Sequence, residues 1–229
     1  MKRFFDYLFI YIPSMFILLS TCWVLTYRWI PVKWTPLMLK RAIENISSSD
    51  YQNRQNWTRK GNISPILIEA ILLTEDQRFY SHNGFDIVEF KTMREEHFLN
   101  GKDIRGCSTI SQQVAKNCFT FGTNTWIRKC IEAYYTVLIE TFWGKERILE
   151  VYLNVAETGI GLYGVEAACL RYFGISASDI SISDAAALAC ILPKPLARTP
   201  RMVMMTNAHR HSAIASKLGE LYNLNSITK

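Results

Sequence analysis

A carboxylic acid at the end of an apolar helix is the first group in this sequence with the potential for chemistry. Residues 66–75 are mostly apolar, and Ser64 and Pro65 before them are typical of an N-cap and a first helical residue. Leu72 lies three positions before Glu75, so a helix places that carboxylate at the edge of an apolar surface. Burial there raises a carboxyl pKa toward the range useful for proton transfer.

The neighbouring acid, Asp76, projects about 100° further around the helix, so the two carboxylates need not share one environment. A simpler interpretation is a core helix that frays into a charged loop, with no catalytic role for Glu75. This stretch alone leaves both interpretations open. The residues that follow it in the sequence shift the balance.

A helix that starts at Thr109 supplies a second set of polar groups. Thr109 and Gln112 fit a capping box, and free backbone amides at such a helix start attract anions. Steps of three and four residues give the helix a polar face that consists of Thr109, Gln112, Gln113 and Lys116. Such a face is either solvated surface or the wall of a substrate groove, and composition alone favours the surface.

A third helix is expected from Thr125 to Glu140, with charged residues near its start. Arg128 and Glu132 are four residues apart, the spacing of an ordinary surface ion pair worth about 0.2–0.5 kcal/mol. In the functional interpretation, Glu132 is a second carboxylate beside two cations, Arg128 and Lys129. That combination suits a pyrophosphate or a metal-bridged pyrophosphate.

An uncharged apolar segment near the N-terminus is long enough to cross a bilayer. At about 1.5 Å per residue, residues 7–27 span about 31 Å. A signal peptide is the alternative, but no small-residue cleavage motif follows the segment. We predict four parts: a cytoplasmic tail (1–6), a transmembrane helix (7–27), a membrane-proximal connector with a short helix near 36–45 (28–61) and an extracytoplasmic domain (62–229).

Charge and cysteine usage narrow the class of partner. A net charge of +6 suits anionic headgroups or pyrophosphates and does not by itself indicate nucleic acid. None of the six cysteines has C-x-x-C or Cys/His ligand spacing, so we expect no zinc site. Disulfide pairing stays open, and most of the cysteines are expected to be small buried apolar residues.

The rest of the chain also indicates helices. Apolar periodicity predicts them at residues 85–100, 145–157, 165–173, 183–192 and 208–222, with Ser183 as the N-cap of the alanine-rich one. Three prolines between residues 193 and 200 predict an extended segment. Residues 159–164 spell G-x-G-x-x-G, which is an accidental match because a helix precedes it. No convincing alternating strand is found, so the predicted fold class is mainly α.

Four motifs, in order, carry a family resemblance. They are Glu75-Asp-x-x-Phe79-x-x-His82-x-Gly84, Gly106-x-Ser-Thr-x-x-Gln-Gln-x-x-Lys-Asn117, Arg128-Lys129-x-x-Glu132, and Ile148-Leu-Glu-x-Tyr-Leu-Asn154 through Tyr172-Phe-Gly174. Together they resemble the peptidoglycan glycosyltransferase family, family 51. The chain length and the context of Glu132 resemble its monofunctional biosynthetic transglycosylases.

The resemblance implies a lysozyme-like helical domain that polymerises lipid II into glycan strands with inversion at the anomeric carbon. Glu75 matches the family's general base, which accepts the proton of the acceptor 4-hydroxyl, and Glu132 matches its second catalytic carboxylate. Lys116 is expected at the donor pyrophosphate. The expected substrate-binding residues are Asp76, Phe79, His82, Ser108, Thr109, Gln112, Gln113, Lys116, Asn117, Arg128 and Lys129.

The same resemblance implies partners and a location. Lipid II, the growing glycan strand and the membrane are the expected partners, transpeptidases and division or elongation proteins are candidates, and nucleic acid is not expected. No cofactor is firmly implied, and a divalent cation, Mg²⁺ or Mn²⁺, bound with the pyrophosphate is the one candidate. The protein is expected to be single-pass in the cytoplasmic (inner) membrane, with its domain on the periplasmic side.

Two departures from the family pattern keep other functions open. Asn124 stands where many members have arginine, eight residues before Glu132, and Cys107 replaces a usual glycine or alanine. A lysozyme-like lytic enzyme would use a similar glutamate but would not need the Gln-Gln-x-x-Lys-Asn stripe. A membrane-anchored scaffold with weakened catalysis is supported only by Asn124.

Overall fold

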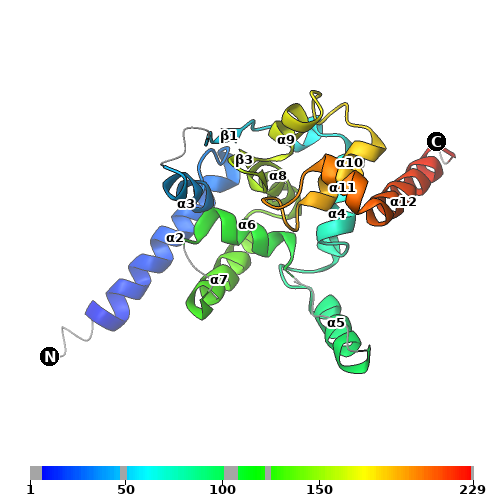
Figure 1. Ribbon diagram of the computed structural model, residues 1–229. Helices are drawn as coiled ribbons and strands as arrows, with labels where there is room; N and C mark the ends of the chain where they lie inside the picture. The colour runs from blue at the N-terminus through cyan, green and yellow to red at the C-terminus, as the bar shows by residue number, and fades with distance from the viewer. Residues whose placement is uncertain (1–6, 47–50, 101–107, 122–124, 228–229) are drawn as a thin grey trace.

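The computed structural model describes residues 7–46, 51–100, 108–121 and 125–227, which are mainly helical (Figure 1). One π-helical turn, η1 (Tyr7–Tyr11), and two 3-10 turns, η2 (Lys60–Asn62) and η3 (Phe79–Ser81), accompany the α-helices. The α-helices are α2 (Ile12–Trp29), α3 (Pro36–Glu44), α4 (Pro65–Glu75), α5 (Ile87–Asn100), α6 (Ile110–Phe119), α7 (Trp126–Phe142), α8 (Lys145–Val155), α9 (Val165–Tyr172), α10 (Ile182–Ile191), α11 (Pro200–Thr206) and α12 (Ala208–Ile227). The prediction of a mainly α fold is confirmed.

The buried centre of the domain is α10, an alanine-rich helix that packs against α4, α11 and α12. All its residues from 185 to 191 are buried, and their small side chains let the surrounding helices approach closely. The predicted cap of this helix was wrong. Ser181, two residues earlier than Ser183, accepts the hydrogen bond from the Asp184 backbone N–H at 3.1 Å, so the helix begins at Ile182.

Three short strands contradict the expectation that the chain has none. They are β1 (Arg54–Gln55), β2 (Glu157–Gly159) and β3 (Leu162–Tyr163), in the order β1-β3-β2, with β1 parallel and β2 antiparallel to β3. Strands of two or three residues are too short to show the alternation by which a strand is recognised in a sequence. The G-x-G-x-x-G spelling belongs to the β2–β3 hairpin, so the match was accidental, as expected.

The proline-rich segment also differs from its prediction. Residues 193–197 form turns, and Pro200 starts α11 where an extended segment was expected. Thr199 caps this helix by accepting a hydrogen bond from the Met202 N–H at 3.3 Å. Proline suits the first helical position because its missing N–H would have no partner there, so Pro200 begins a helix.

The segment expected to be a membrane-proximal connector contributes to the body of the domain. Within it, α3 begins at the predicted position, with Thr35 as N-cap, and packs against α6 through the fully buried Met38. Arg41 on α3 forms an ion pair with Glu157 of the hairpin at 2.9 Å. Helix α3 is therefore held by the domain on more than one side.

The first long helix leaves the domain at the lower left of Figure 1 and is anchored at its C-terminal half. Residues Phe9–Trp29 are long and apolar enough to cross a membrane, by length and composition. Near its end, the buried Trp143 indole N–H donates to the Val24 carbonyl at 2.8 Å. Arg147 donates to the carbonyls of Tyr27 and Ile30 at 2.7 and 2.6 Å. These bonds fix the direction in which α2 leaves the domain.

We expect Trp143→Phe to destabilise the protein by about 1–3 kcal/mol, since it removes a buried hydrogen bond to α2 but keeps an aromatic ring. The melting temperature in detergent should fall by about 2–10 °C. Trp126→Phe is the matched control, because Trp126 is 84% exposed at the start of α7. Equal melting temperatures for the two variants would contradict a stabilising role for the Trp143 bond.

Candidate active site

The carboxylate of Glu75 lies at the end of α4, half-buried, with its two oxygens in different surroundings. Oε2 accepts a hydrogen bond from the Gln113 amide Nε2 at 2.8 Å. Oε1 is buried and has no hydrogen-bond partner among the described residues. Burial raises the pKa of Glu75, and the Gln113 bond and the charge of Arg210 oppose that rise only in part. The site therefore contains a basic carboxylate with one free oxygen.

The orientation of the Gln113 amide is set by a residue that sequence reasoning did not single out. Tyr152 on α8 is 1% exposed, and its hydroxyl lies 3.5 Å from Gln113 Oε1, to which it donates. Because this oxygen faces Tyr152, the amide NH₂ faces Glu75. The Ile-Leu-Glu-x-Tyr-Leu-Asn motif contained Tyr152, but only the fold shows that its hydroxyl reaches α6.

Arg210 is the second residue that the sequence did not indicate. It lies on α12, more than 130 positions after Glu75, and its positive charge favours the ionised form of that carboxylate. The sequence around it reads as an ordinary polar helix, so no local pattern marks it. Proximity of this kind depends on how α12 packs against α4.

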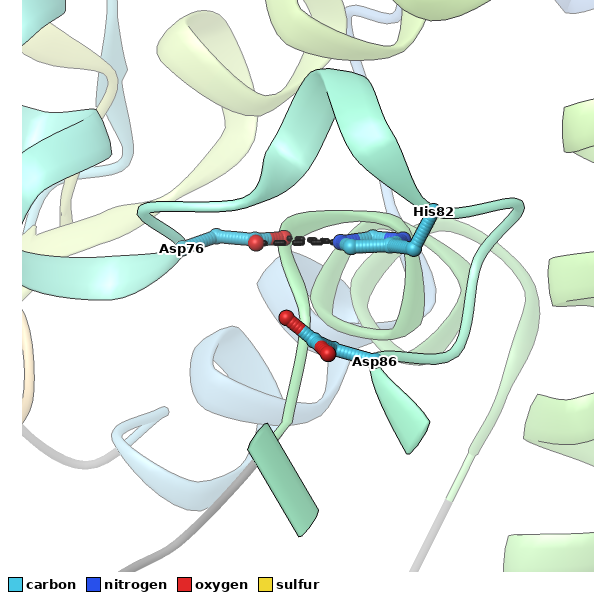
Figure 2. A group of neighbouring side chains, drawn as sticks. All are labelled: Asp76, His82 and Asp86. Carbon is cyan, nitrogen blue, oxygen red and sulfur yellow. Dashed lines mark hydrogen bonds and ion pairs between the residues drawn. The ribbon is translucent and has the colours of Figure 1, made fainter. Parts of the chain in front are cut away.

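Asp76 lies in a buried cluster with His82 and Asp86 (Figure 2). His82 Nε2 lies 3.0 and 3.1 Å from the two Asp76 oxygens, and the Gly84 N–H donates to Nδ1 at 3.1 Å. Asp76 also accepts from the Ile110 N–H, the first backbone amide of α6, at 2.9 Å. One carboxylate thus ties the end of α4 to the start of α6, and the two adjacent acids have separate environments, as predicted.

The ligand atoms of this cluster lie within 4.8 Å of one another, but their hydrogen bonds leave little room for a metal ion. Nδ1 accepts from Gly84, so Nε2 carries the ring proton and donates to Asp76, which leaves neither nitrogen lone pair free. Asp86 is engaged with Arg78 at 3.2 Å. The cluster is a structural link between helix ends.

Gly84 provides the backbone conformation that the turn after His82 requires. Its φ of +88° is a left-handed conformation that favours glycine, and a Cβ there would lie 2.7 Å from the Thr136 methyl on α7. Thr109 donates to the Gly84 carbonyl at 2.7 Å. The loop between α4 and α5 can therefore pass close to both α6 and α7.

Several residues predicted to bind substrate are packed into the protein. Each is at most 8% exposed: Asp76, Phe79, His82, Thr109 and Asn117. Asp76, His82 and Thr109 make the internal hydrogen bonds described above, and the Phe79 ring packs under the Lys145 ammonium at 4.5 Å. In this structure they position the neighbouring elements, and a direct contact of these five with substrate stays a prediction.

The polar face predicted for α6 is formed, with its capping box. The Gln112 N–H donates to Thr109 Oγ1 at 3.2 Å, and Gln112 Oε1 accepts from the Thr109 N–H at 3.0 Å. Lys116 is exposed one turn beyond Gln113, which is about 4.5 Å along the helix axis. Because the two residues are three positions apart, Lys116 lies on the same face of α6 as Gln113, the residue that contacts Glu75. Ser108, before the cap, is exposed.

On α7, Arg128 and Glu132 form the ion pair that their spacing predicts. Their side chains are only 12% and 14% exposed, so this is not an ordinary surface pair. Lys129 is exposed beside them, and α7 packs against α6. The two elements that carry the predicted cations are therefore neighbours. Cys107 and Asn124, the two departures from the family pattern, lie outside the described residues.

The described cysteines are unpaired, and three of the five are buried, as expected: Cys118, Cys169 and Cys190. Burial raises the pKa of the Cys118 thiol, so this residue stays neutral and packs as a small apolar side chain. Cys22 and Cys130 are exposed. None of the three buried residues takes part in the Glu75 site.

Comparisons with known proteins identify the family of this chain. A family model described as Transglycosylase matches residues 40–219. A biosynthetic peptidoglycan transglycosylase of Caulobacter vibrioides is 47% identical over 173 residues, which cover 76% of this chain and 73% of that protein. Proteins of the same name from Bdellovibrio bacteriovorus and Bacteroides thetaiotaomicron are 42% and 45% identical, covering 79% and 76% of this chain and 72% and 70% of theirs.

The chain therefore belongs to the transglycosylase family and is a glycosyltransferase with a lysozyme-like helical domain. The match begins within α3 and ends within α12, so it includes α4, α6, α7 and α8 and the part of α12 that carries Arg210. The resemblance inferred from the four motifs is confirmed.

We expect Gln113→Ala to move the acid limb of the rate profile to higher pH. The Gln113 bond favours the ionised form of Glu75 and lowers its pKa, so losing the bond raises that pKa further. A base must be ionised to act, so activity should be lost at a higher pH than in the wild type. The measurement is kcat/KM against pH. Gln77→Ala is the control, since Gln77 is exposed just after α4 and its amide donates to the Leu73 carbonyl of that helix. An acid limb that stays in place would mean that Glu75 is not the titrating group.

Proposed function

We propose that this enzyme polymerises lipid II into peptidoglycan glycan strands, with Glu75 as the general base. The observation that carries the proposal is the free, buried Oε1 of Glu75, whose other oxygen is held by Gln113. A carboxylate in this state has a raised pKa and an open position for one hydroxyl group. The names of the relatives support peptidoglycan as the product.

In the proposed reaction, the acceptor's N-acetylglucosamine 4-hydroxyl donates its hydrogen bond to Glu75 Oε1. As Glu75 takes that proton, O4 attacks the anomeric carbon of the donor, and the bond from this carbon to the pyrophosphate oxygen breaks. Attack from the face opposite the leaving group inverts the anomeric centre. The products are a glycan longer by one disaccharide and undecaprenyl pyrophosphate, which leaves with the bonding electron pair.

The leaving pyrophosphate gains negative charge, and nearby cations stabilise it. Lys116 is exposed on α6, three residues after Gln113, which bonds to Glu75. Arg128 and Lys129 on α7 add further positive charge. Cations fixed where charge develops lower the barrier because they need little reorganisation during the reaction. Glu132 keeps the Arg128 guanidinium in place through their ion pair.

The donor side fits a resident divalent cation poorly. Glu132 is the one carboxylate among the residues that we assign to the pyrophosphate, and it is already paired with Arg128. Mg²⁺ prefers an octahedral set of oxygen ligands, with one or two carboxylates from the protein. We therefore propose that side-chain cations carry the charge of the leaving group, and no step here depends on a metal ion.

We also propose a location for the reaction. The exposed apolar part of α2 supports a single-pass anchor, with the domain on the periplasmic side of the cytoplasmic membrane. Lipid II presents its pyrophosphate at that surface, within reach of a domain bonded to the anchor. Transpeptidases and division or elongation proteins are the proposed protein partners, because a new glycan strand has to be cross-linked into the wall.

We expect Glu75→Gln to lower the rate of lipid II polymerisation at least about 100-fold, since the amide keeps the shape but cannot accept the proton. Polymer formed from purified lipid II is the measurement, and an unchanged circular dichroism spectrum shows that the fold is kept. Glu69→Gln is the matched control on the same helix, because Glu69 lies about 1.7 turns earlier. Near-normal polymer from Glu75→Gln would exclude Glu75 as the base, and shortening of preformed glycan without polymer would indicate a lytic enzyme.

Lys116→Ala is expected to raise the KM for the lipid-linked donor by about 10- to 100-fold, because a charged hydrogen bond to the pyrophosphate is lost. The control is Lys217→Ala, an exposed lysine on α12. Steady-state kinetics at several lipid II concentrations separate KM from kcat. If kcat falls and KM stays constant, Lys116 does not bind the donor in its ground state.

A further inference from the structure

A cavity lies apart from the residues of the Glu75 site. It has a volume of about 400 Å³ and is formed by β1, the β2–β3 hairpin, α9 and the segment that leads into α11. These elements lie in the upper part of Figure 1, whereas the exposed half of α2 leaves at the lower left. We call it the arginine pocket, after Arg54, Arg171 and Arg198 in its lining.

The arginine pocket has uncompensated positive charge. None of its described lining residues is acidic, and none of the three arginines forms a salt bridge within the described parts of the chain. Arg54 donates to the Gln52 amide oxygen, and Arg198 makes one long bond of 3.4 Å to the Cys190 carbonyl. Most of their N–H groups are therefore available, and a guanidinium binds carboxylates well through paired N–H donors.

Apolar side chains make up much of the remaining wall, and this limits the kind of anion. Ile160 and Leu162 come from the hairpin, and Leu196 and Met202 come from the other side. An inorganic anion gains nothing from such surfaces, whereas an organic anion buries its apolar groups against them. A cavity of this volume is suited to a few amino-acid residues that carry carboxylates.

The walls of the pocket are held in place before any ligand binds. Gly161, at the tip of the hairpin, has a φ of +63°, and a Cβ there would overlap the Gln52 carbonyl oxygen. The Arg54 N–H donates to the Gly161 carbonyl at 2.8 Å, so β1 and the hairpin are locked together. A preformed site costs little ordering entropy on binding.

The wall of the pocket contacts α10, the helix that also packs against the Glu75 helix. Arg198 bonds to the carbonyl of Cys190, which lies in the last turn of α10. The same helix packs against α4, the helix that ends at Glu75. The wall of the pocket and the helix that carries Glu75 are therefore both attached to α10.

We propose that the arginine pocket binds the carboxylates of the short peptides that a peptidoglycan strand carries. This inference rests on the proposed function, because it takes the enzyme's own product as the ligand. The strand leaves the Glu75 site with a peptide on each disaccharide, and each peptide has free carboxylates and small apolar side chains. Binding one of them holds the strand on the enzyme between successive additions.

The test measures binding by the full-length protein in detergent. The probes are a free wall tetrapeptide with its carboxylates intact, the same peptide with those groups amidated, and inorganic phosphate. We expect the intact peptide to bind, and amidation to weaken binding at least about tenfold. The double variant Arg171→Gln/Arg198→Gln should show a similar loss, and Arg171→Lys/Arg198→Lys, which keeps both charges, should recover part of the affinity.

Arg201→Gln is the matched control, since Arg201 is an exposed arginine of α11 that does not line the pocket. Equal peptide affinity in the wild type and the glutamine double variant would overturn the proposal. Binding of phosphate as tight as that of the peptide would also overturn it, because the pocket would then be a simple anion site.

Two further outcomes separate this inference from the proposed function. Glu75→Gln should bind the peptide normally while it makes no polymer. If the wild type polymerises lipid II but does not bind the peptide, the inference alone fails. If the wild type makes no polymer from lipid II, the proposed function fails, and the peptide measurement then reports only whether the pocket binds such ligands.

Discussion

The hydrogen bond between Gln113 and Glu75 is the contact on which the site depends. It joins two helices that are far apart in the sequence, and it fills one carboxylate oxygen while the other stays free. The Tyr152 hydroxyl donates to the oxygen of the Gln113 amide and so orients it. Asp76 fixes the start of α6 by accepting a hydrogen bond from the Ile110 N–H. Burial raises the pKa of this carboxylate, which suits the general-base role that we propose for Glu75.

The sequence predicted features that depend on local spacing, and the structure agrees with them. The apolar helix that ends at Glu75, the capping box at Thr109 and the Arg128–Glu132 pair all follow from neighbours three or four residues apart. The bond of Tyr152 to Gln113 and the field of Arg210 at Glu75 depend on packing between distant elements, so no local pattern marks them. The short strands were missed for a different reason. Two or three residues are too few to show the alternation of apolar and polar side chains that marks a strand.

The attachment of α2 gives the site a defined position relative to the helix that we propose as the membrane anchor. Trp143 and Arg147 bond to backbone carbonyls of α2, and both lie close in sequence to helices that pack against α6. The anchor is therefore bonded to the same body that holds Gln113 and Lys116. A rigid attachment limits the depths at which a membrane-bound substrate can meet Glu75, whereas a flexible tether would allow many orientations that cannot react.

Glu75 and Asp76 show how one dipeptide supplies both the acid that we propose as the base and a structural acid. Asp76 accepts hydrogen bonds from the Ile110 backbone N–H and from His82, so its carboxylate is bonded within the protein. Glu75 has a single donor and a buried free oxygen. Adjacent side chains at a helix end diverge by about 100°. This angle lets Asp76 bond to the first N–H of α6 while Glu75 bonds to Gln113 on the polar face of that helix. Because Asp76 and Glu75 are consecutive residues, any movement of the α6 start relative to α4 would also displace Gln113 from Glu75.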